Sequence, residues 1–133
     1  MAKFDVTAED VARGTILRPG WYRFKISKVE DKPAKTDGSP VTFVTCVVQD
    51  GKDHQDQPAP NVPVLAVFSV KAAGSIVNFY NAFVPEDKRI GKGGMAGVSI
   101  DDRFVGKEAS IYVVNDQYEG RTTNKAQDFR PLS

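Results

Sequence analysis

Apolar and polar side chains alternate along the stretch WYRFKISKVE, residues 21–30. Tyr22, Phe24 and Ile26 fall on one face of an extended chain, because successive side chains of a strand point to opposite sides. The other face carries Trp21, Arg23 and Lys25. This pattern predicts a half-buried β-strand with one face in water.

Four further segments have the character of strands. Residues 41–50 (VTFVTCVVQD) are apolar or β-branched on both faces, which is typical of a central strand. Residues 62–71 predict a third strand, and we expect Pro63 at its start or on a sheet edge, because proline cannot donate a ladder hydrogen bond. Residues 107–115 predict a fourth strand, and TTNKAQDFRP, after the turn YEGR, predicts a fifth and more polar one.

The spacing of apolar side chains becomes helical after residue 71. Ile76, Phe79 and Phe83 fall on one side of a helix, and this spacing predicts an amphipathic helix of about three turns within residues 72–84. Pro85 marks its end. The glycine-rich residues 85–103 predict a long loop.

The predicted order is therefore strand, strand, strand, helix, strand, strand. Five strands with a helix between the third and the fourth is the order of the OB fold, a partly open Greek-key barrel that binds oligonucleotides and oligosaccharides. We predict a mainly β chain with a five-stranded OB-fold barrel that binds nucleic acid over residues 19–133 and an N-terminal arm over residues 1–18. A five-stranded sheet with one helix packed on it in another topology fits the same order.

Charge and cysteine content change this picture little. The chain has 133 residues, 18 Lys and Arg against 17 Asp and Glu, and one cysteine. A net charge of +1 neither favours nor excludes a nucleic-acid partner, because binding needs a local basic surface. Cys46 lies in an apolar run, so we expect a small buried side chain and not a reactive thiol. The sequence shows no apolar stretch typical of a secretory signal or a membrane span, so we expect a cytoplasmic location.

The sequence contains few residues in an arrangement that catalysis would need. The single histidine, His54, stands in a polar loop, and no cysteine–histidine cluster has zinc spacing. Asp101 and Asp102 are adjacent, and adjacent side chains diverge in strands and loops. We predict no enzyme activity, no metal and no cofactor. A nuclease that uses Asp101 or Asp102 is the enzyme alternative.

Cations and aromatic rings gather on the first strand with the loop after it, and again in the last hairpin. A single-stranded nucleic acid needs cations along its phosphates and flat rings under its bases. In an OB fold, the loops that join strands 1 to 2 and 4 to 5 flank the binding face. We predict nucleic-acid contacts from Trp21, Arg23, Lys25, Lys32, Lys35, Tyr118, Arg121, Lys125 and Phe129. A solvated sheet face also carries alternating cations, which is the simpler interpretation.

Three stretches carry a resemblance to a known family. They are the Pro-Gly-Trp-Tyr opening of the first strand, the helix GSIVNFYNAF, and the ending VGKEASIYVVNDQYEGRTTNKAQDFRP. Over about residues 15–131 the chain resembles small bacteriophage single-stranded-DNA-binding proteins, long catalogued as a family of unknown function. The resemblance implies an OB fold and sequence-independent binding of single-stranded DNA in phage DNA replication or recombination, in the host cytoplasm. It also implies homo-oligomers and replication or recombination proteins as partners.

One feature departs from that family, and one other function fits the sequence. Many single-stranded-DNA-binding proteins end in an acidic tail that recruits partners, whereas this chain ends FRPLS, so we do not expect recruitment through such a tail. The alternative function is a protein–protein interaction module of a phage, with the barrel bound to a recombinase, a nuclease or a host factor.

Overall fold

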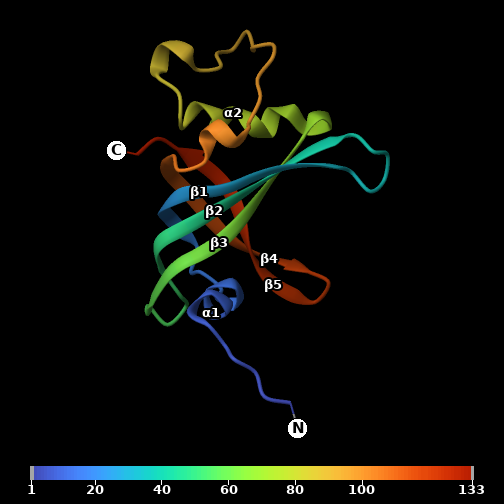
Figure 1. Ribbon diagram of the computed structural model, residues 1–133. Coiled ribbons are helices and arrows are strands. Elements are labelled where there is room, and N and C mark those ends of the chain that lie inside the picture. The colour runs from blue at the N-terminus through green and yellow to red at the C-terminus, as the bar shows by residue number, and fades with distance from the viewer. Residues whose placement is uncertain (1, 133) are drawn as a thin grey trace.

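Five antiparallel strands and two short α-helices make up the computed structural model of the chain, which describes residues 2–132 (Figure 1). The strands are β1 (Gly20–Pro33), β2 (Pro40–Lys52), β3 (Pro58–Ser69), β4 (Glu108–Tyr118) and β5 (Arg121–Arg130). The α-helices are α1 (Ala8–Gly14) and α2 (Ile76–Asn81), and short 3₁₀ helices cover Val70–Ser75, Glu86–Lys88 and Asp102–Phe104. The prediction of a mainly β chain is confirmed. No helix in residues 2–132 is long and apolar enough to cross a membrane.

The strands form a single sheet in the order β3-β2-β1-β4-β5, in which all neighbours are antiparallel. β1 stands at the centre, where Gly20–Lys25 pair with β4 and the strand from Phe24 onward pairs with β2. β3 and β5 are the two edges. They approach each other, but no ladder of hydrogen bonds joins them within residues 2–132, so the sheet is not closed. Pro63 lies on the edge strand β3, as expected for a residue without an amide hydrogen.

Two bulges change which side chains face the core. In the β1–β2 ladder the register shifts between Ile26 and Lys28, and in the β4–β5 ladder it shifts between Tyr112 and Val113. A bulge inserts one extra residue on one strand, so every later side chain of that strand changes face. Ile26 and Val29 therefore both face the core, although their numbers differ in parity.

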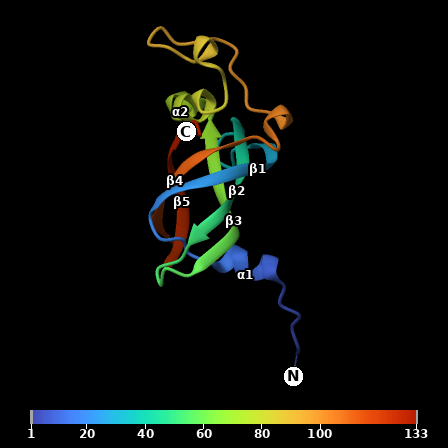
Figure 2. The same cartoon turned by 90° about the vertical axis from the view of Figure 1, so that its left-hand side faces the viewer.

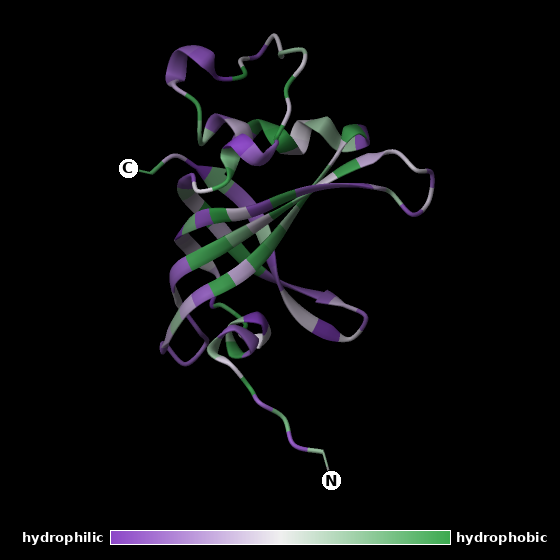
Figure 3. Cartoon of the chain, in the orientation of Figure 1, coloured by the Kyte–Doolittle hydropathy of each residue, from purple (hydrophilic) through white to green (hydrophobic). Residues whose placement is uncertain are grey.

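The core lies between the inner faces of the strands and α2. Its fully buried side chains come from the alternate positions that the sequence pattern predicts, among them Phe24, Ile26, Val44, Val48, Val62, Val64, Ile111 and Val113. Cys46 belongs to this set, which confirms the prediction of a small buried side chain, and burial raises the pKa of its thiol to about 12. Figure 3 shows polar residues along the β4–β5 hairpin and apolar residues in the middle of the sheet.

The predicted helix covers one end of the sheet (Figures 1 and 2). It is shorter than the spacing predicts, because Val70–Ser75 is a 3₁₀ segment interrupted at Ala72 by non-helical backbone angles, and regular α-helix begins at Ile76. Phe79 is fully buried, with its ring centroid 4.9 Å from that of Phe68 and 5.0 Å from that of Phe83. This aromatic cluster joins α2 to the core.

The segment before β1 packs against the sheet at its C-terminal end, around Leu17. Thr7 and Asp10 form a reciprocal capping box that starts α1, in which hydrogen bonds from Thr7 hold the pKa of the Asp10 carboxyl below its ordinary value. Leu17 is fully buried in the core, and its amide donates to the side-chain carbonyl of Asn124 over 2.8 Å. The side chain of Asn115 donates to the Leu17 carbonyl over 2.8 Å. The division of the chain at residue 18 stays a prediction.

Candidate nucleic-acid interface

Two hairpin turns project to the same side of the sheet. The β1–β2 turn, residues 34–39, and the β4–β5 turn at Glu119 and Gly120 both lie on the right in Figure 1. Glu119 and Gly120 have φ angles of 50° and 76°. Two successive positive φ angles are typical of a two-residue type I′ turn, whose twist matches that of its strands. The turns are the two walls of the candidate interface.

The first wall is made by the second half of β1 and the turn after it. Because of the bulge after Ile26, Lys28 and Lys32 face outward, beside Glu30. The Nζ atoms of the two lysines lie 2.5 and 3.4 Å from carboxylate oxygens of Glu30, and the hydrogen bond from Lys28 holds the pKa of Glu30 below its ordinary value. Lys35, within the turn, is exposed and has no ion pair among residues 2–132. The outward face of this wall is cationic, with three lysines against Glu30, whereas Asp31 and Asp37 bring the charge of the whole segment to zero.

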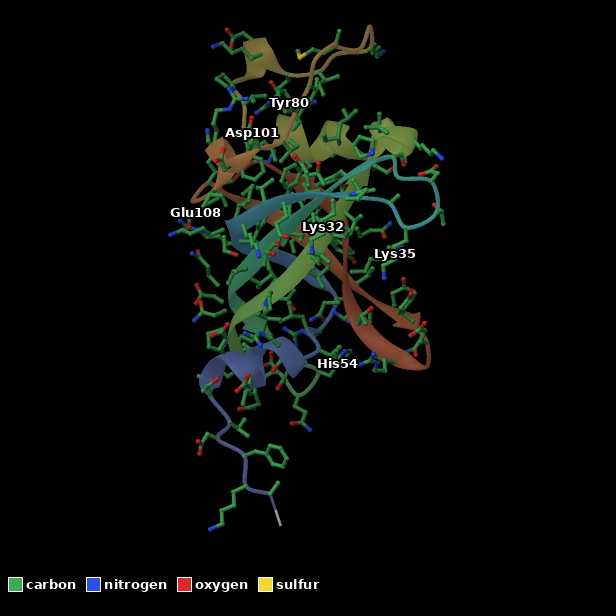
Figure 4. The ribbon with its side chains drawn as sticks, turned by 45° about the vertical axis from the view of Figure 1, so that its right-hand side comes forward. Lys32, Lys35, His54, Tyr80, Asp101 and Glu108 are labelled. Atoms are coloured by element: carbon green, nitrogen blue, oxygen red, sulfur yellow. The ribbon has the colours of Figure 1, made fainter. Side chains whose placement is uncertain are left out.

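Figure 4 is turned so that the side on which the turns project comes forward. Lys35 lies between the β1–β2 turn and the β4–β5 hairpin, and Lys32 lies over the middle of the sheet. Asp37, within the β1–β2 turn, forms an ion pair with Lys71, the second residue after β3.

The second wall is the β4–β5 hairpin. Tyr118 and Arg121 stand opposite each other next to the turn, and both are exposed. Lys125 follows four residues later on β5, with its Nζ 3.8 Å from a carboxylate oxygen of Asp116. Because an exposed ion pair at this distance contributes little, Lys125 can exchange Asp116 for a phosphate at small cost. The predicted residues Tyr118, Arg121 and Lys125 are thus brought together.

The floor between the walls is the outer face of β2 and β3. Phe43 stands opposite Val67 and Thr45 opposite Leu65, on the face that points away from the core. Leu65 is 52% exposed and Val67 is 51% exposed. The Nζ atom of Lys32 lies 5.7 Å from the centroid of the Phe43 ring, so the cationic wall borders this floor.

Sequence reasoning missed the floor, although a signal for it exists. Residues 41–50 of β2 are apolar or β-branched on both faces, which led to the prediction of a central strand, and no exposed apolar face is predicted for β3. Once Val44, Val64 and Ala66 are assigned to the core, the positions between them must face outward. In this structure no element of residues 2–132 covers Leu65 and Val67 fully.

A hollow extends the floor toward β5. It has a volume of about 400 Å³ and lies between the two edge strands. Its lining includes Leu65 and Val67 from β3 and Lys125 and Gln127 from β5. The floor and the second wall are therefore continuous, which gives a strip of surface that runs from one turn to the other.

The first half of β1 does not belong to this strip. Trp21, Arg23 and Lys25 face outward where β1 pairs with β4. Glu108, the partner of Arg23, lies on the left of Figure 4, whereas Lys35 lies on the right. The predicted contact residues Trp21, Arg23 and Lys25 therefore lie apart from Lys35, because β1 crosses from one side of the sheet to the other (Figure 4).

Two of these three outward side chains, Arg23 and Trp21, contact charged neighbours. The Arg23 guanidinium lies 2.9 Å from the carboxylate of Glu108, and its hydrogen bond holds the pKa of Glu108 below the ordinary value. The guanidinium carbon of Arg130 lies 4.1 Å from the centroid of Trp21, and the ring of Tyr112 meets Trp21 edge-on at 5.3 Å. A base could stack on that face of Trp21 only if Arg130 moved.

Phe129 is not a surface residue, which corrects the sequence prediction. It is 9% exposed, and its ring centroid lies 4.9 Å from that of Phe79 and 5.8 Å from that of Phe24. The bulge in the β4–β5 ladder is the reason, because Lys125 faces outward before it and Phe129 faces the core after it.

His54 and Asp101, two of the residues considered for catalysis, each form a hydrogen bond with a neighbouring side chain. The Nε2 atom of His54 lies 2.8 Å from the side-chain oxygen of Asn115. Asp101 accepts from the Nε atom of Arg103 at 2.9 Å, and this hydrogen bond holds the pKa of the Asp101 carboxyl below its ordinary value. Within residues 2–132 no group of three His, Cys, Asp or Glu side chains is placed to hold a metal ion. The absence of enzyme activity stays a prediction.

Comparison with known proteins adds no assignment. Neither a scan of protein-family models nor a search of curated proteins found a match for this chain.

Proposed function

We propose that this chain is an OB-fold protein that binds single-stranded DNA without sequence preference in phage DNA replication or recombination. The observation that carries the proposal is the exposed strip between two turns, with Lys28, Lys32 and Lys35 at one side and Tyr118, Arg121 and Lys125 at the other. Cations that track a backbone and rings for stacking are the two needs of such binding.

The arrangement of the strands supports the OB fold. Five antiparallel strands surround one core, a helix stands between β3 and β4, and β1 pairs with both β2 and β4. The edges β3 and β5 face each other without hydrogen bonds, which fits a partly open barrel. In that fold the loops corresponding to the β1–β2 and β4–β5 turns flank the ligand.

Each part of the strip has a separate role in the proposed binding. The ammonium groups of Lys32 and Lys35, with the guanidinium of Arg121, neutralise successive phosphates and release the counter-ions that the free strand holds. The exposed ring of Tyr118 provides a stacking face for a base. Leu65 and Val67 shield bases and sugars from water without a preference for any base, because they offer no hydrogen bonds.

A direct binding titration tests this function. Fluorescence polarisation of labelled oligo-dT is expected to report saturable binding that weakens as salt is added. Labelled duplex of the same length serves as the control and is expected to bind more weakly. The intrinsic fluorescence of Trp21 is expected to change little, because its ring lies outside the strip and under Arg130. Absence of binding to any single strand would refute the proposal.

A second function is favoured by the chemistry of the floor. Leu65 and Val67 are aliphatic, and a nucleic-acid surface of this size would more often carry aromatic rings. The same strip could hold an apolar segment of a recombinase, a nuclease or a host factor. In a pull-down from infected cells after nuclease treatment, this function predicts a protein that is lost with Leu65→Ser and Val67→Ser and retained with Tyr118→Ala.

A further inference from the structure

The segment before α1 exposes two large apolar side chains. Residues 2–6 extend away from the body of the molecule in Figure 1, and Phe4 is 82% exposed and Val6 69% exposed. They alternate with Lys3 and Asp5, so in an extended chain Phe4 and Val6 lie along one side. The capping box at Thr7 fixes the point from which the segment leaves α1. Within one copy these side chains have no apolar surroundings.

A large hollow lies at the other end of the molecule (Figure 1). It has a volume of about 640 Å³ and lies between the end of the β1–β2 hairpin, the Val70–Ser75 segment with α2, and the loop of residues 90–100. Its apolar lining includes Phe68, Val70, Ile76, Val77, Met95 and Val98. Val70 and Met95 are among the exposed large apolar side chains. This volume is in the range of pockets that enclose a compact apolar group.

The hollow has a fixed wall and a single charge. The side chain of Asn81 accepts from the amide of Ile90 over 2.8 Å and donates to its carbonyl over 3.1 Å, so the start of the loop is pinned to α2. Asp31 is the charged residue in the lining, and its carboxylate accepts from the Thr42 hydroxyl over 2.7 Å. Asp31 has no ion pair among residues 2–132.

We propose that the hollow binds residues 2–6 of a second copy of this chain. The ring of Phe4 fills the apolar part, Val6 packs beside it, and the ammonium group of Lys3 pairs with Asp31. A copy cannot fill its own hollow, because the segment and the hollow lie at opposite ends (Figures 1 and 2). The contact joins two different surfaces, so it repeats from copy to copy and builds rows instead of closing into a symmetric pair.

Sedimentation velocity of the full chain without nucleic acid tests this contact. Association that grows with protein concentration is expected for the unaltered chain. Phe4→Ser removes the inserted ring and Val70→Glu places a charge at the hollow, and each is expected to weaken association about tenfold or more. Both residues are exposed, so the fold is expected to persist. Val105→Ser, an exposed apolar position outside both surfaces, is the matched control and is expected to associate normally.

Mixing the two variants separates this geometry from other assemblies. A Phe4→Ser copy keeps its hollow and a Val70→Glu copy keeps its arm, so an equal mixture is expected to form dimers and nothing larger. A monomeric unaltered chain, normal association of either variant, or a mixture without dimers would overturn the inference. Met95→Glu repeats the test at a second position of the hollow. The result is independent of the proposed DNA binding, because a short oligo-dT is expected to bind all these variants equally.

Discussion

On the first half of β1, Arg23 forms an ion pair with Glu108, and Arg130 covers Trp21. On the second half and in the turn after it, Lys32 lies over Phe43, and Lys35 extends toward the β4–β5 hairpin. The two halves have similar residue types within one strand. They differ in their neighbours. Two side chains of the first half meet a carboxylate and a guanidinium, whereas the second half has its own carboxylate, Glu30, but also borders an exposed apolar floor.

The comparison teaches that charge alone does not identify a binding surface. A cation already paired must give up its partner before it can hold a phosphate, and a ring already stacked must release its partner before it can hold a base. Lys35 has no ion pair among residues 2–132, and the contact of Lys32 with Glu30 is longer, at 3.4 Å, than the 2.9 Å pair of Arg23 with Glu108, so both cations give up less when they bind a phosphate. We therefore expect binding energy to come from the second half of β1 and the β4–β5 hairpin.

The largest expected difference between the halves is in affinity for oligo-dT at low salt. Lys32→Glu with Lys35→Glu is expected to weaken binding about a hundredfold, because two phosphate contacts are replaced by repulsion. Arg23→Glu with Lys25→Glu makes the same change of charge on the first half and is expected to weaken binding less than about threefold. Equal losses of affinity for the two double variants in polarisation titrations would show that the two halves of β1 do not differ in DNA binding.

Tyr118 and Trp21 are expected to affect different properties: Tyr118 the affinity for DNA, and Trp21 the stability of the fold. Tyr118→Ala is expected to weaken binding by about 1–3 kcal/mol and to leave the urea midpoint unchanged, because the ring is exposed and stacks on a base. Trp21→Ala is expected to leave binding within about twofold and to lower the free energy of unfolding by about 1–2 kcal/mol, because its contacts with Arg130 and Tyr112 are lost. The reverse pattern would place the site on the first half of β1.

The floor is expected to contribute less to the affinity for oligo-dT than the two walls do. Leu65→Ser with Val67→Ser is expected to weaken oligo-dT binding about threefold to tenfold, because half-exposed side chains can bury only part of their surface. Val105→Ser, an exposed apolar position elsewhere, is the control and should bind as the unaltered chain does. Unchanged binding in the double variant would mean that the floor does not contact DNA, and it would favour the protein-interaction function.

The smallest expected effect is the pH dependence of the Arg23–Glu108 pair. The hydrogen bond from Arg23 lowers the pKa of Glu108 in the folded chain, so its contribution to stability is present above the ordinary glutamate value, about 4.3. That contribution is lost as the pH falls through the lower folded value. The unaltered chain should melt at a slightly higher temperature than Glu108→Gln at pH 7, and the difference should shrink as the pH falls below the ordinary glutamate pKa. A constant difference would mean that the pair does not stabilise the first half.

Much of the sheet could be predicted from the alternation of side chains. Phe24 and Ile26 are buried and Arg23 and Lys25 are exposed, because a strand with one face in a core must repeat every two residues. The helical spacing of Phe79 likewise predicts the element that covers the end of the sheet. The prediction of hairpin turns after the first and the fourth strand is confirmed at residues 34–39 and at Glu119 and Gly120, because these segments have strong turn chemistry.

The two bulges could not be predicted from the sequence, and they determine which side chains face the candidate interface. Strict alternation would place Lys32 with Ile26 on the core face, and would place Phe129 with Lys125 on the outer face. The extra residue in each strand reverses both assignments. Nothing local in the sequence fixes where a bulge falls, because it depends on how the strand must bend around the core.

The exposed floor and the open edge depend on tertiary structure. Leu65 and Val67 have the composition of a buried strand, and only the position of β3 at the sheet edge leaves them in water. The sequence gives no measure of the gap between β3 and β5, because closure depends on the tilt and stagger of all five strands.

The salt dependence of oligo-dT binding tests the central claim most directly. The logarithm of the affinity is expected to fall linearly with the logarithm of the salt concentration, with a slope of about −0.7 for each phosphate contact. Lys32→Gln with Lys35→Gln should reduce the steepness of this slope by about 1.4, whereas Arg23→Gln with Lys25→Gln should leave it unchanged. A slope unaffected by the Lys32 and Lys35 pair, or reduced by the Arg23 and Lys25 pair, would contradict the placement of the site between the two turns.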